Sequence, residues 1–354
     1  MVIYKRIVSS GIIIALLLSF NIQVSACTIF EKQQGDQVLV GNNEDWVYSM
    51  PSNMWLVAPE EDSYGRVCFA LSSYVQGGMN EKGLFYDGAT CPASKVPFKK
   101  GNTLLGMDFG EVVLSKCTNV QEAIEMVKKI NIPGNFSDHI FFADETGNTA
   151  VVEWVENEMR IIPKEGNYQI ATNFWLSNQK LGGYPCKRFD KAKEMLEDQK
   201  DISVTYFADI LKATSQDWGD GGTKYSNVYD LRNKEVYIYQ KGDFEKSAKC
   251  NLTEDIKKLG TGGKRVYKLE ELSYQKEKSP NHKADVKAGD EKKQAKADTA
   301  MAIATASAEQ KALSTTMNAD NNSFDTRMFI MVLILFFTVT TLMFIVFKRR
   351  QRKE

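Results

Sequence analysis

The sequence predicts an α+β domain in which antiparallel sheets and helices are packed in layers. Short segments rich in β-branched and aromatic residues alternate with Gly, Asn and Asp turn signals along the middle of the chain. Two of these turns, DETGN at 144–148 and DLRNKE at 230–235, separate neighbouring strand-like segments and indicate hairpins. Two pairs of other segments place apolar residues at helical spacing. Hairpins combined with paired helices favour antiparallel sheets over repeated βαβ units.

These patterns assign the elements in order. The expected strands are 37–43, 66–73, 83–89, 139–145, 149–155, 168–173 and 235–241. The expected helices are 103–115, 120–129, 187–199 and 204–214. The sequence contains no internal repeat. We therefore expect one folded domain over residues 27–272, which is long enough to bury a substantial core.

The start of the chain has the pattern of a secretory signal. A basic pair at 5–6 precedes an apolar run at 11–20 and the small residues VSA. That run is too short to span a bilayer, which needs about 20 residues. We expect 1–26 to be a cleaved signal peptide, so that Cys27 becomes the first residue.

A second apolar run lies near the other end. Residues 328–347 carry no charge and are followed directly by KRRQRKE at 348–354. Twenty helical residues cover the ~30 Å hydrocarbon core, and the basic cluster places the tail in the cytoplasm. Residues 273–327 are rich in Lys, Ala, Asp, Ser and Thr, a composition that buries too little apolar surface to fold. The sequence predicts a disordered tether, a single transmembrane helix and a folded domain on the extracytoplasmic face of the cell membrane.

The charge balance disfavours nucleic acid as a partner. The whole chain of 354 residues has 45 basic and 45 acidic side chains. Two basic residues belong to the signal, and five basic and one acidic residue belong to the tail, which leaves 38 basic and 44 acidic side chains over 27–327. A mildly acidic body lacks the cationic surface that nucleic-acid binding requires.

The sequence contains few residues suited to catalysis by histidine or to metal binding. Of two histidines, His282 lies in the predicted tether and His139 precedes an apolar strand, where we expect a structural role. The six cysteines have no regular spacing and imply no disulfide scaffold. No CxxC, HExxH or clustered His/Asp pattern is present, so neither a metal nor a cofactor is expected.

Cys27 is distinctive because signal cleavage would bring a thiol and an α-amino group onto one residue. A free α-amine titrates near ~8, so at neutral pH it can accept the thiol proton, and no histidine is required. The alternative is a bacterial lipoprotein signal, in which the thiol is lipidated and cannot catalyse. Against lipidation, the sequence after Cys27 runs straight into strand-like residues rather than a flexible linker, and 328–347 already supplies an anchor.

Seven segments in order carry a resemblance to a known family: CTIF, GNNEDW, GGMNEKGLFYDGATCP, HIFFADETGNTAVVEW, ATNFW, KRFDKAKEML and TKYSNVYDLRNKEVYIY. The chain resembles the choloylglycine hydrolase family, the N-terminal nucleophile hydrolases of linear amides that include bile salt hydrolases and penicillin V acylases. The resemblance covers nearly all of 27–244. It implies a four-layer αββα fold, with two antiparallel sheets between helix layers.

The resemblance implies roles for five residues. Cys27 is the implied nucleophile, with its freed amine as general base, and Asp45 in GNNED is implied to orient that amine. Asn173 in ATN is implied to bind the oxyanion through its side-chain amide, and Thr90 in DGATCP through its backbone N–H. Arg188 in KRF matches the family's active-site arginine. The structural alternatives are a turn aspartate, a loop asparagine and a helix-surface arginine.

One position departs from the family. Asn42 stands where the family usually has an arginine, so a cation that would lower the thiol pKa and position the substrate is lost. The change indicates a less activated thiol or a different substrate. Beside the implied site residues, Trp46 and Phe174 are the aromatic side chains that we expect to line an apolar substrate pocket.

The sequence thus predicts a membrane-anchored, cell-surface hydrolase of linear amide C–N bonds that acts on a small-molecule N-acyl amide. Two alternatives stay open. One is an acyltransferase of the same fold, and the other is a non-catalytic surface domain lipidated at Cys27.

Overall fold

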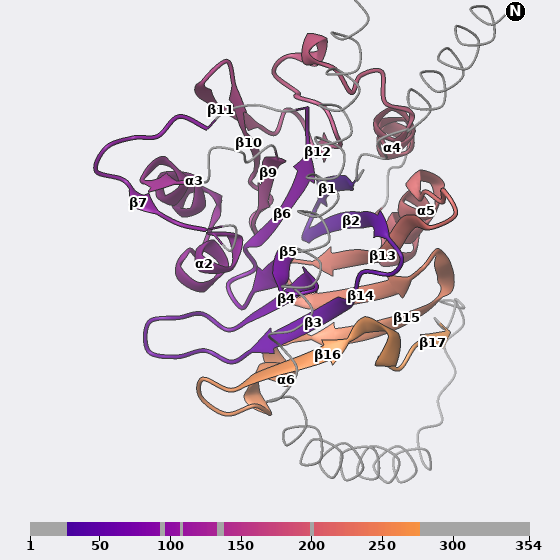
Figure 1. Ribbon diagram of the computed structural model, residues 1–354. Helices are drawn as coiled ribbons and strands as arrows, with labels where there is room; N and C mark the ends of the chain where they lie inside the picture. Colours follow the sequence, from indigo (N-terminus) through magenta and orange to yellow (C-terminus); the bar gives the residue numbers. More distant parts are fainter. Residues whose placement is uncertain (1–26, 93–95, 107–108, 133–137, 199–201, 277–354) are drawn as a thin grey trace, which may run out of the picture. The chain divides into compact units, whose positions relative to one another are not determined.

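The computed structural model describes residues 27–92, 96–106, 109–132, 138–198 and 202–276 (Figure 1). The predicted signal peptide, the predicted transmembrane helix and the basic tail lie outside the described residues, as does the predicted tether from residue 277 on. Within the described part of the chain, no helix is both long and apolar enough to cross a membrane.

Two antiparallel sheets form the centre of the domain (Figure 1). The seven-stranded sheet has the order β12 (Tyr168–Ala171), β1 (Thr28–Gln34), β2 (Gln37–Val47), β13 (Gly221–Asp230), β14 (Glu235–Gln240), β15 (Asp243–Asn251) and β17 (Gln275–Lys276). The eight-stranded sheet has the order β11 (Glu158–Pro163), β10 (Thr149–Val155), β9 (Asp138–Ala143), β6 (Phe85–Thr90), β5 (Tyr74–Asn80), β4 (Arg66–Leu71), β3 (Ser52–Val57) and β16 (Lys264–Lys268). The two predicted hairpins are confirmed as the β9–β10 and β13–β14 pairs.

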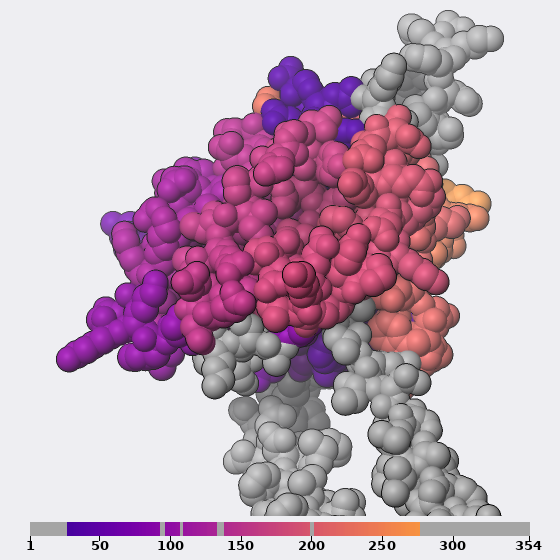
Figure 2. Space-filling model, turned by 90° about the horizontal axis from the view of Figure 1, so that it is seen from above, coloured from indigo at the N-terminus to yellow at the C-terminus, as the bar shows by residue number. Residues whose placement is uncertain are grey.

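Helices cover the outer face of each sheet. α2 (Phe109–Lys116) and α3 (Val120–Lys128) pack on the eight-stranded sheet, whereas α4 (Lys187–Asp198) and α5 (Val204–Thr214) pack on the seven-stranded sheet. The described residues also form a short helix, α6 (Leu252–Lys257), and the 3-10 turns η1 (Gln179–Leu181) and η2 (Leu269–Glu271). The order helix, sheet, sheet, helix agrees with the predicted layers. Segments that include β12, η1 and α4, coloured magenta to salmon, make up most of the face seen from above (Figure 2).

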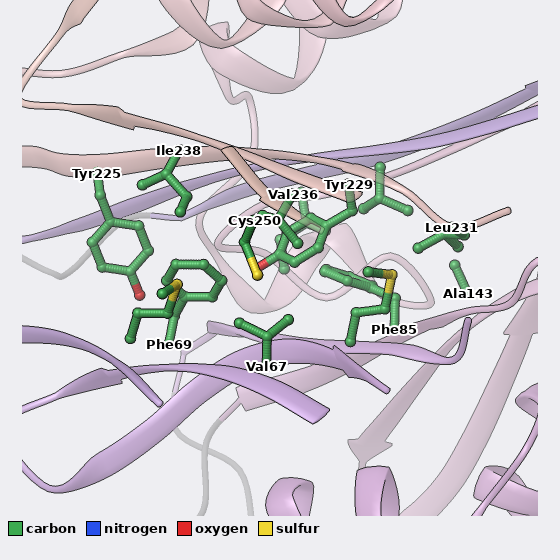
Figure 3. Close-up of a cluster of buried hydrophobic side chains, with 14 of the residues drawn as sticks. Val67, Phe69, Phe85, Ala143, Tyr225, Tyr229, Leu231, Val236, Ile238 and Cys250 are labelled. Atoms are coloured by element: carbon green, nitrogen blue, oxygen red, sulfur yellow. The ribbon is translucent and has the colours of Figure 1, made fainter. Parts of the chain in front are cut away.

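The layers follow from the alternation of side chains along the strands. In β2, Val38 and Val40 face the other sheet, while Leu39 between them packs with the α4 and α5 side chains. The inter-sheet core contains aromatic side chains from both sheets, such as Phe69 of β4 and Tyr229 of β13 (Figure 3). This layer is apolar over most of its extent, so polar groups within it call for an explanation.

Two sequence expectations need correction. The helix predicted over 103–115 begins only at Phe109, because β7 (Thr103–Leu104) pairs in parallel with β8 (Ile130–Asn131) and uses those residues as a short strand. Residues 273–276, which the sequence assigns to the tether, are part of the folded domain. Tyr274 packs against the inter-sheet core, and Gln275 of β17 pairs with Ser247 of β15.

Gly78 in β5 lies too close to the neighbouring strand to carry a side chain. A Cβ there would lie 2.2 Å from the Val67 carbonyl oxygen and 3.0 Å from the Cys68 Cα, both backbone atoms of β4. We expect Gly78→Ala to lower the free energy of unfolding by about 2 kcal/mol or more in denaturant titrations. Gly88→Ala in β6 is the control, because its Cβ would meet no atom closer than 3.6 Å. Equal losses in both variants would contradict this packing.

Candidate active site

Cys27 directly precedes β1 at one end of the inter-sheet layer. Its side chain belongs to the inter-sheet core, and the residue is 4% exposed. In the β1–β2 pair Thr28 lies opposite Asn43, so the next position along the register places Cys27 beside Glu44. The Cys27 thiol accordingly donates to Glu44 Oε1, with Sγ and oxygen 3.8 Å apart.

The surroundings of the thiol oppose its ionisation. Burial raises the pKa of the Cys27 thiol well above its usual value, and the nearby carboxyls of Glu44, Asp45 and Asp87 raise it further. A hydrogen bond from the backbone of Asp45 acts in the other direction and lowers this pKa. A positive charge close to the sulfur is therefore what the thiol needs to become a nucleophile.

Arg188 of α4 links the start of β1 to the segment after β12. Its Nη1 donates to the Cys27 carbonyl oxygen at 2.5 Å and to Thr28 Oγ1 at 2.8 Å, and its Nη2 donates to Asn173 Oδ1 at 2.8 Å. Asn173 Nδ2 in turn donates to the Thr90 carbonyl oxygen at 2.7 Å. The structure thus brings Cys27, Thr90, Asn173 and Arg188 together through one chain of hydrogen bonds, although they are up to 161 residues apart.

Asp45 lies at the same end of the sheet, held by two side chains from the seven-stranded side. Thr223 Oγ1 donates to Asp45 Oδ1 at 2.5 Å, and Gln216 Nε2 donates to Asp45 Oδ2 at 2.6 Å. Burial raises the pKa of Asp45 to about 6, while the Thr223 bond, the charge of Arg188 and the Gln216 bond lower it. These bonds fix the carboxylate beside the nucleophile, where the sequence predicts it to orient an amine.

Asn42 lies two residues before Glu44 on β2, and both side chains face the eight-stranded sheet because alternate residues share a face. Asn42 Nδ2 donates to Asp87 Oδ2 of β6 in a short hydrogen bond. Asn42 therefore contributes an amide to an acidic part of the inter-sheet layer.

The two aromatic residues expected to line a pocket have different positions. Phe174 is fully buried, with ring centroids 5.1 Å from both Phe189 of α4 and Tyr184, so it packs beneath the helix that holds Arg188 rather than lining an open surface. That expectation is corrected, because the ring is used to position α4. Trp46 is half-buried against the inter-sheet core, and its role in lining a pocket stays a prediction.

His139 has the structural role that the sequence predicts. It is fully buried, and its Nδ1 lies 3.2 Å from Glu153 Oε1. Glu153 also accepts from the backbone N–H groups of Leu176 and Ser177, so the pair fixes the segment that follows Asn173.

All six cysteines are buried free thiols. Within the part of the chain that the structure describes, no group of three or more His, Cys, Asp or Glu side chains is arranged to hold a metal ion.

Sequence reasoning missed Glu44, Asp87, Thr223 and Gln216. Glu44 could have been found from the sequence. Once β1 and β2 are recognised as a hairpin, their register alone places Glu44 opposite Cys27. Thr223 of β13 lies opposite Asp45 in the β2–β13 register, and Gln216 reaches Asp45 from the residues after α5. Asp87 of β6 comes from the opposite sheet, so only the packing of the two sheets reveals it.

The comparison with family models settles the relationship. The model of the acyl-coenzyme A:6-aminopenicillanic acid acyl-transferase family matches residues 32–242. The chain belongs to this acyl-transferase family. The match covers more than half of the chain and runs from β2 to β14. Asp45, Asn173 and Arg188 all lie within the matched residues. The resemblance to the choloylglycine hydrolase group is confirmed with it, whereas no curated protein matches in a direct comparison.

Solved structures extend the likeness to the fold. A penicillin V acylase from Agrobacterium tumefaciens is 17% identical with a TM-score of 0.56, and the match covers 68% of this chain and 90% of that chain. A variant of conjugated bile acid hydrolase from Clostridium perfringens, with one arginine replaced by leucine, is 20% identical with a TM-score of 0.55, over 72% of this chain and 99% of that chain. This member of the acyl-transferase family therefore has the N-terminal nucleophile hydrolase fold.

Proposed function

We propose that the mature chain hydrolyses linear amide C–N bonds with Cys27 as the nucleophile. The observation that carries the proposal is the hydrogen-bond chain from the Cys27 carbonyl through Arg188 and Asn173 to Thr90, at the head of β1. It holds a thiol, a neutral amide and a cation at one end of the sheets, the set that acyl transfer requires. The penicillin V acylase and the bile acid hydrolase that share this fold are amide hydrolases, which supports this chemistry.

The proposed reaction has two steps. The Cys27 thiolate attacks the amide carbonyl carbon and forms a C–S bond, and the carbonyl oxygen becomes an oxyanion that Asn173 Nδ2 and the Thr90 N–H stabilise. The C–N bond then breaks, and the α-ammonium of Cys27 gives its proton to the leaving amine. In the second step, water attacks the thioester, with the α-amine as base, and releases the acid and the free thiol.

Removal of the leader is the proposed activating event. In the uncleaved chain the Cys27 nitrogen is a peptide amide without charge. After cleavage it is an ammonium beside the sulfur, which offsets the three carboxyls that raise the thiol pKa. A unit charge at about 4 Å contributes ~1 kcal/mol in water and ~4 kcal/mol near a protein surface, which favours the thiolate by ~5-fold to ~1,000-fold. In this proposal Asp45 holds the new ammonium.

We further propose that residues 328–347 anchor the protein in the cell membrane, with the folded domain outside the cell and the tail in the cytoplasm. The twenty uncharged residues followed by KRRQRKE support this arrangement.

Acyl transfer is the second candidate function, and the description of the matched family favours it. The first half-reaction is the same, but an amine takes the acyl group from Cys27 in place of water. The two are separated by incubating the mature chain with an N-acyl amide, with and without a second amine, and quantifying products by mass spectrometry. Hydrolysis predicts one free acid for each amine released in both conditions. A new amide that replaces the acid would support acyl transfer, and no product in either condition would contradict both.

A further inference from the structure

The inter-sheet layer contains a group of polar side chains that the catalytic steps do not use. We call it the acceptor cluster: Asn42 and Glu44 of β2, Asp87 of β6 and Asn227 of β13. All four are at most 2% exposed, although they lie within the apolar layer between the sheets. Asn42 and Asn227 are cross-strand partners in the β2–β13 pair, and Asp87 reaches them from the opposite sheet.

The cluster is rich in acceptors and poor in donors. Each of its two amide nitrogens donates one hydrogen bond: Asn42 Nδ2 to Asp87, and Asn227 Nδ2 to Tyr229 Oη at 3.1 Å. Both amide oxygens, Asn42 Oδ1 and Asn227 Oδ1, are buried and receive no hydrogen bond from the residues that the structure describes. A buried acceptor without a donor costs about 1–3 kcal/mol, so these oxygens indicate a missing group that brings N–H or O–H donors.

The cluster is also short of positive charge. Burial, then the neighbouring carboxyls, raise the pKa of Glu44 well above its usual value, and burial raises that of Asp87. Asp138 of β9, which bonds to the Thr90 side chain, adds to the repulsion. The cations that lie nearby have other partners: Lys224 donates to the Tyr48 carbonyl oxygen at 2.9 Å, and Arg188 is held by Cys27 and Asn173.

The shape of the cluster is fixed by its backbone. A Cβ on Gly77 of β5 would lie 2.5 Å from Asp87 Oδ2, so this glycine leaves the room that the carboxylate occupies. Glu44 joins the cluster to the reaction centre, because its Oε1 lies 3.8 Å from the nucleophilic sulfur. A donor bonded to that oxygen at ~2.8 Å lies within about 7 Å of Cys27 Sγ.

We propose that the acceptor cluster binds a primary ammonium group of the substrate, and that the enzyme prefers amides in which this group lies two to four bonds from the scissile carbonyl. This inference rests on the proposed function. An ammonium supplies three N–H donors and one positive charge, which matches the two amide oxygens without donors and the two carboxyl groups beside them. An inorganic cation is the weaker fit, because the described residues contain no group of side chains arranged to hold a metal ion.

The test uses pairs of amides that differ only in charge. For the acyl side, the p-nitroanilide of β-alanine is compared with those of butanoic acid, in which a methyl replaces the ammonium, and of succinic acid, which is anionic. For the amine side, octanoyl ethylenediamine is compared with octanoyl propylamine. We expect kcat/KM for the ammonium member of at least one pair to exceed that of its neutral partner about tenfold or more at low salt, and the succinyl compound to be the poorest.

The variants assign the preference to the cluster. Glu44→Gln and Asp87→Asn should bring the charged-to-neutral ratio towards one, whatever they do to the rate itself. Asp36→Asn is the matched control, because Asp36 is fully exposed and pairs only with Arg232 among the ion pairs of the described residues. A ratio at or below one in both pairs, or a ratio that survives in both cluster variants, would overturn the inference.

Binding separates this inference from the catalytic proposal. In the mature Cys27→Ala chain, calorimetry should show the ammonium member binding about tenfold or more tightly than its neutral partner, even though no turnover occurs. Equal binding overturns the inference while leaving hydrolysis of neutral amides intact. A metal ion is the remaining alternative. The inference is also overturned if 10 mM CaCl₂ at constant ionic strength abolishes the preference and Glu44→Gln abolishes calcium binding.

Discussion

Replacing Cys27 by alanine should lower the rate of amide hydrolysis by at least about 10⁴-fold, because no other group in the site can form the acyl intermediate. Cys27 joins the network of Arg188, Asn173 and Thr90 through its carbonyl oxygen, and its thiol donates to Glu44 at the same end of the sheets. The measurement is amine release from N-acyl amides by the mature, detergent-purified chain, with the leader removed in both proteins.

Two controls keep this result specific. Cys186→Ala removes another buried thiol, bonded to Thr172 rather than to the network, and should retain most of the activity. Cys27→Ser keeps a hydroxyl at the same place, so slow acylation at a serine oxygen is expected in place of none. Undiminished turnover in Cys27→Ala would remove Cys27 from the mechanism.

Leaving a single extra residue in front of Cys27 should lower kcat by about 10³-fold or more. The extra peptide bond replaces the α-ammonium by a neutral amide, so the thiol keeps a pKa raised by burial and by three carboxyls, and the leaving amine loses its proton donor. The comparison is between chains that begin at Cys27 and at a glycine directly before it, each released by the same site-specific protease.

Thiol alkylation measures the same effect without a substrate. At pH 7 the chain that begins at Cys27 should react with iodoacetamide far faster than the extended chain, while both unfold at the same denaturant concentration. Matching alkylation and turnover rates in the two chains would show that the freed amine has no part in the reaction.

The part of the site that could be predicted from the sequence is the part that stands in motifs of a known family. Cys27, Asp45, Asn173 and Arg188 stand in motifs whose order in the sequence matches a known family, and the structure places them together. The resemblance assigns no role to Glu44 or Asp87. The β1–β2 register places Glu44 opposite Cys27, whereas the proximity of Asp87 depends on how the two sheets stack. Neither residue lies in a local sequence pattern that predicts burial of a carboxyl group between the sheets.

The fold was predictable from the sequence where local residues determine the conformation of a helix or hairpin. The hairpins, α3, α4 and α5 follow from turn residues and helical spacing. Residues 103–104 were misassigned because their strand conformation depends on pairing with β8, whose residues lie twenty-seven positions further along the chain. Phe174 was misassigned because adjacency to Asn173 in sequence does not decide which side of the backbone its ring occupies.

The central claim is that Cys27, as the first residue of the mature chain, is the acylated nucleophile. It is tested most directly by intact-mass and peptide-mass measurement on the protein purified from cells, before and after a brief incubation with a slowly turned-over acyl donor. The account predicts a chain that begins with an unmodified Cys27 and then gains one acyl group as a hydroxylamine-sensitive thioester on that residue. A diacylglyceryl group on Cys27, an intact leader in the active protein or an acyl group on another residue would contradict it.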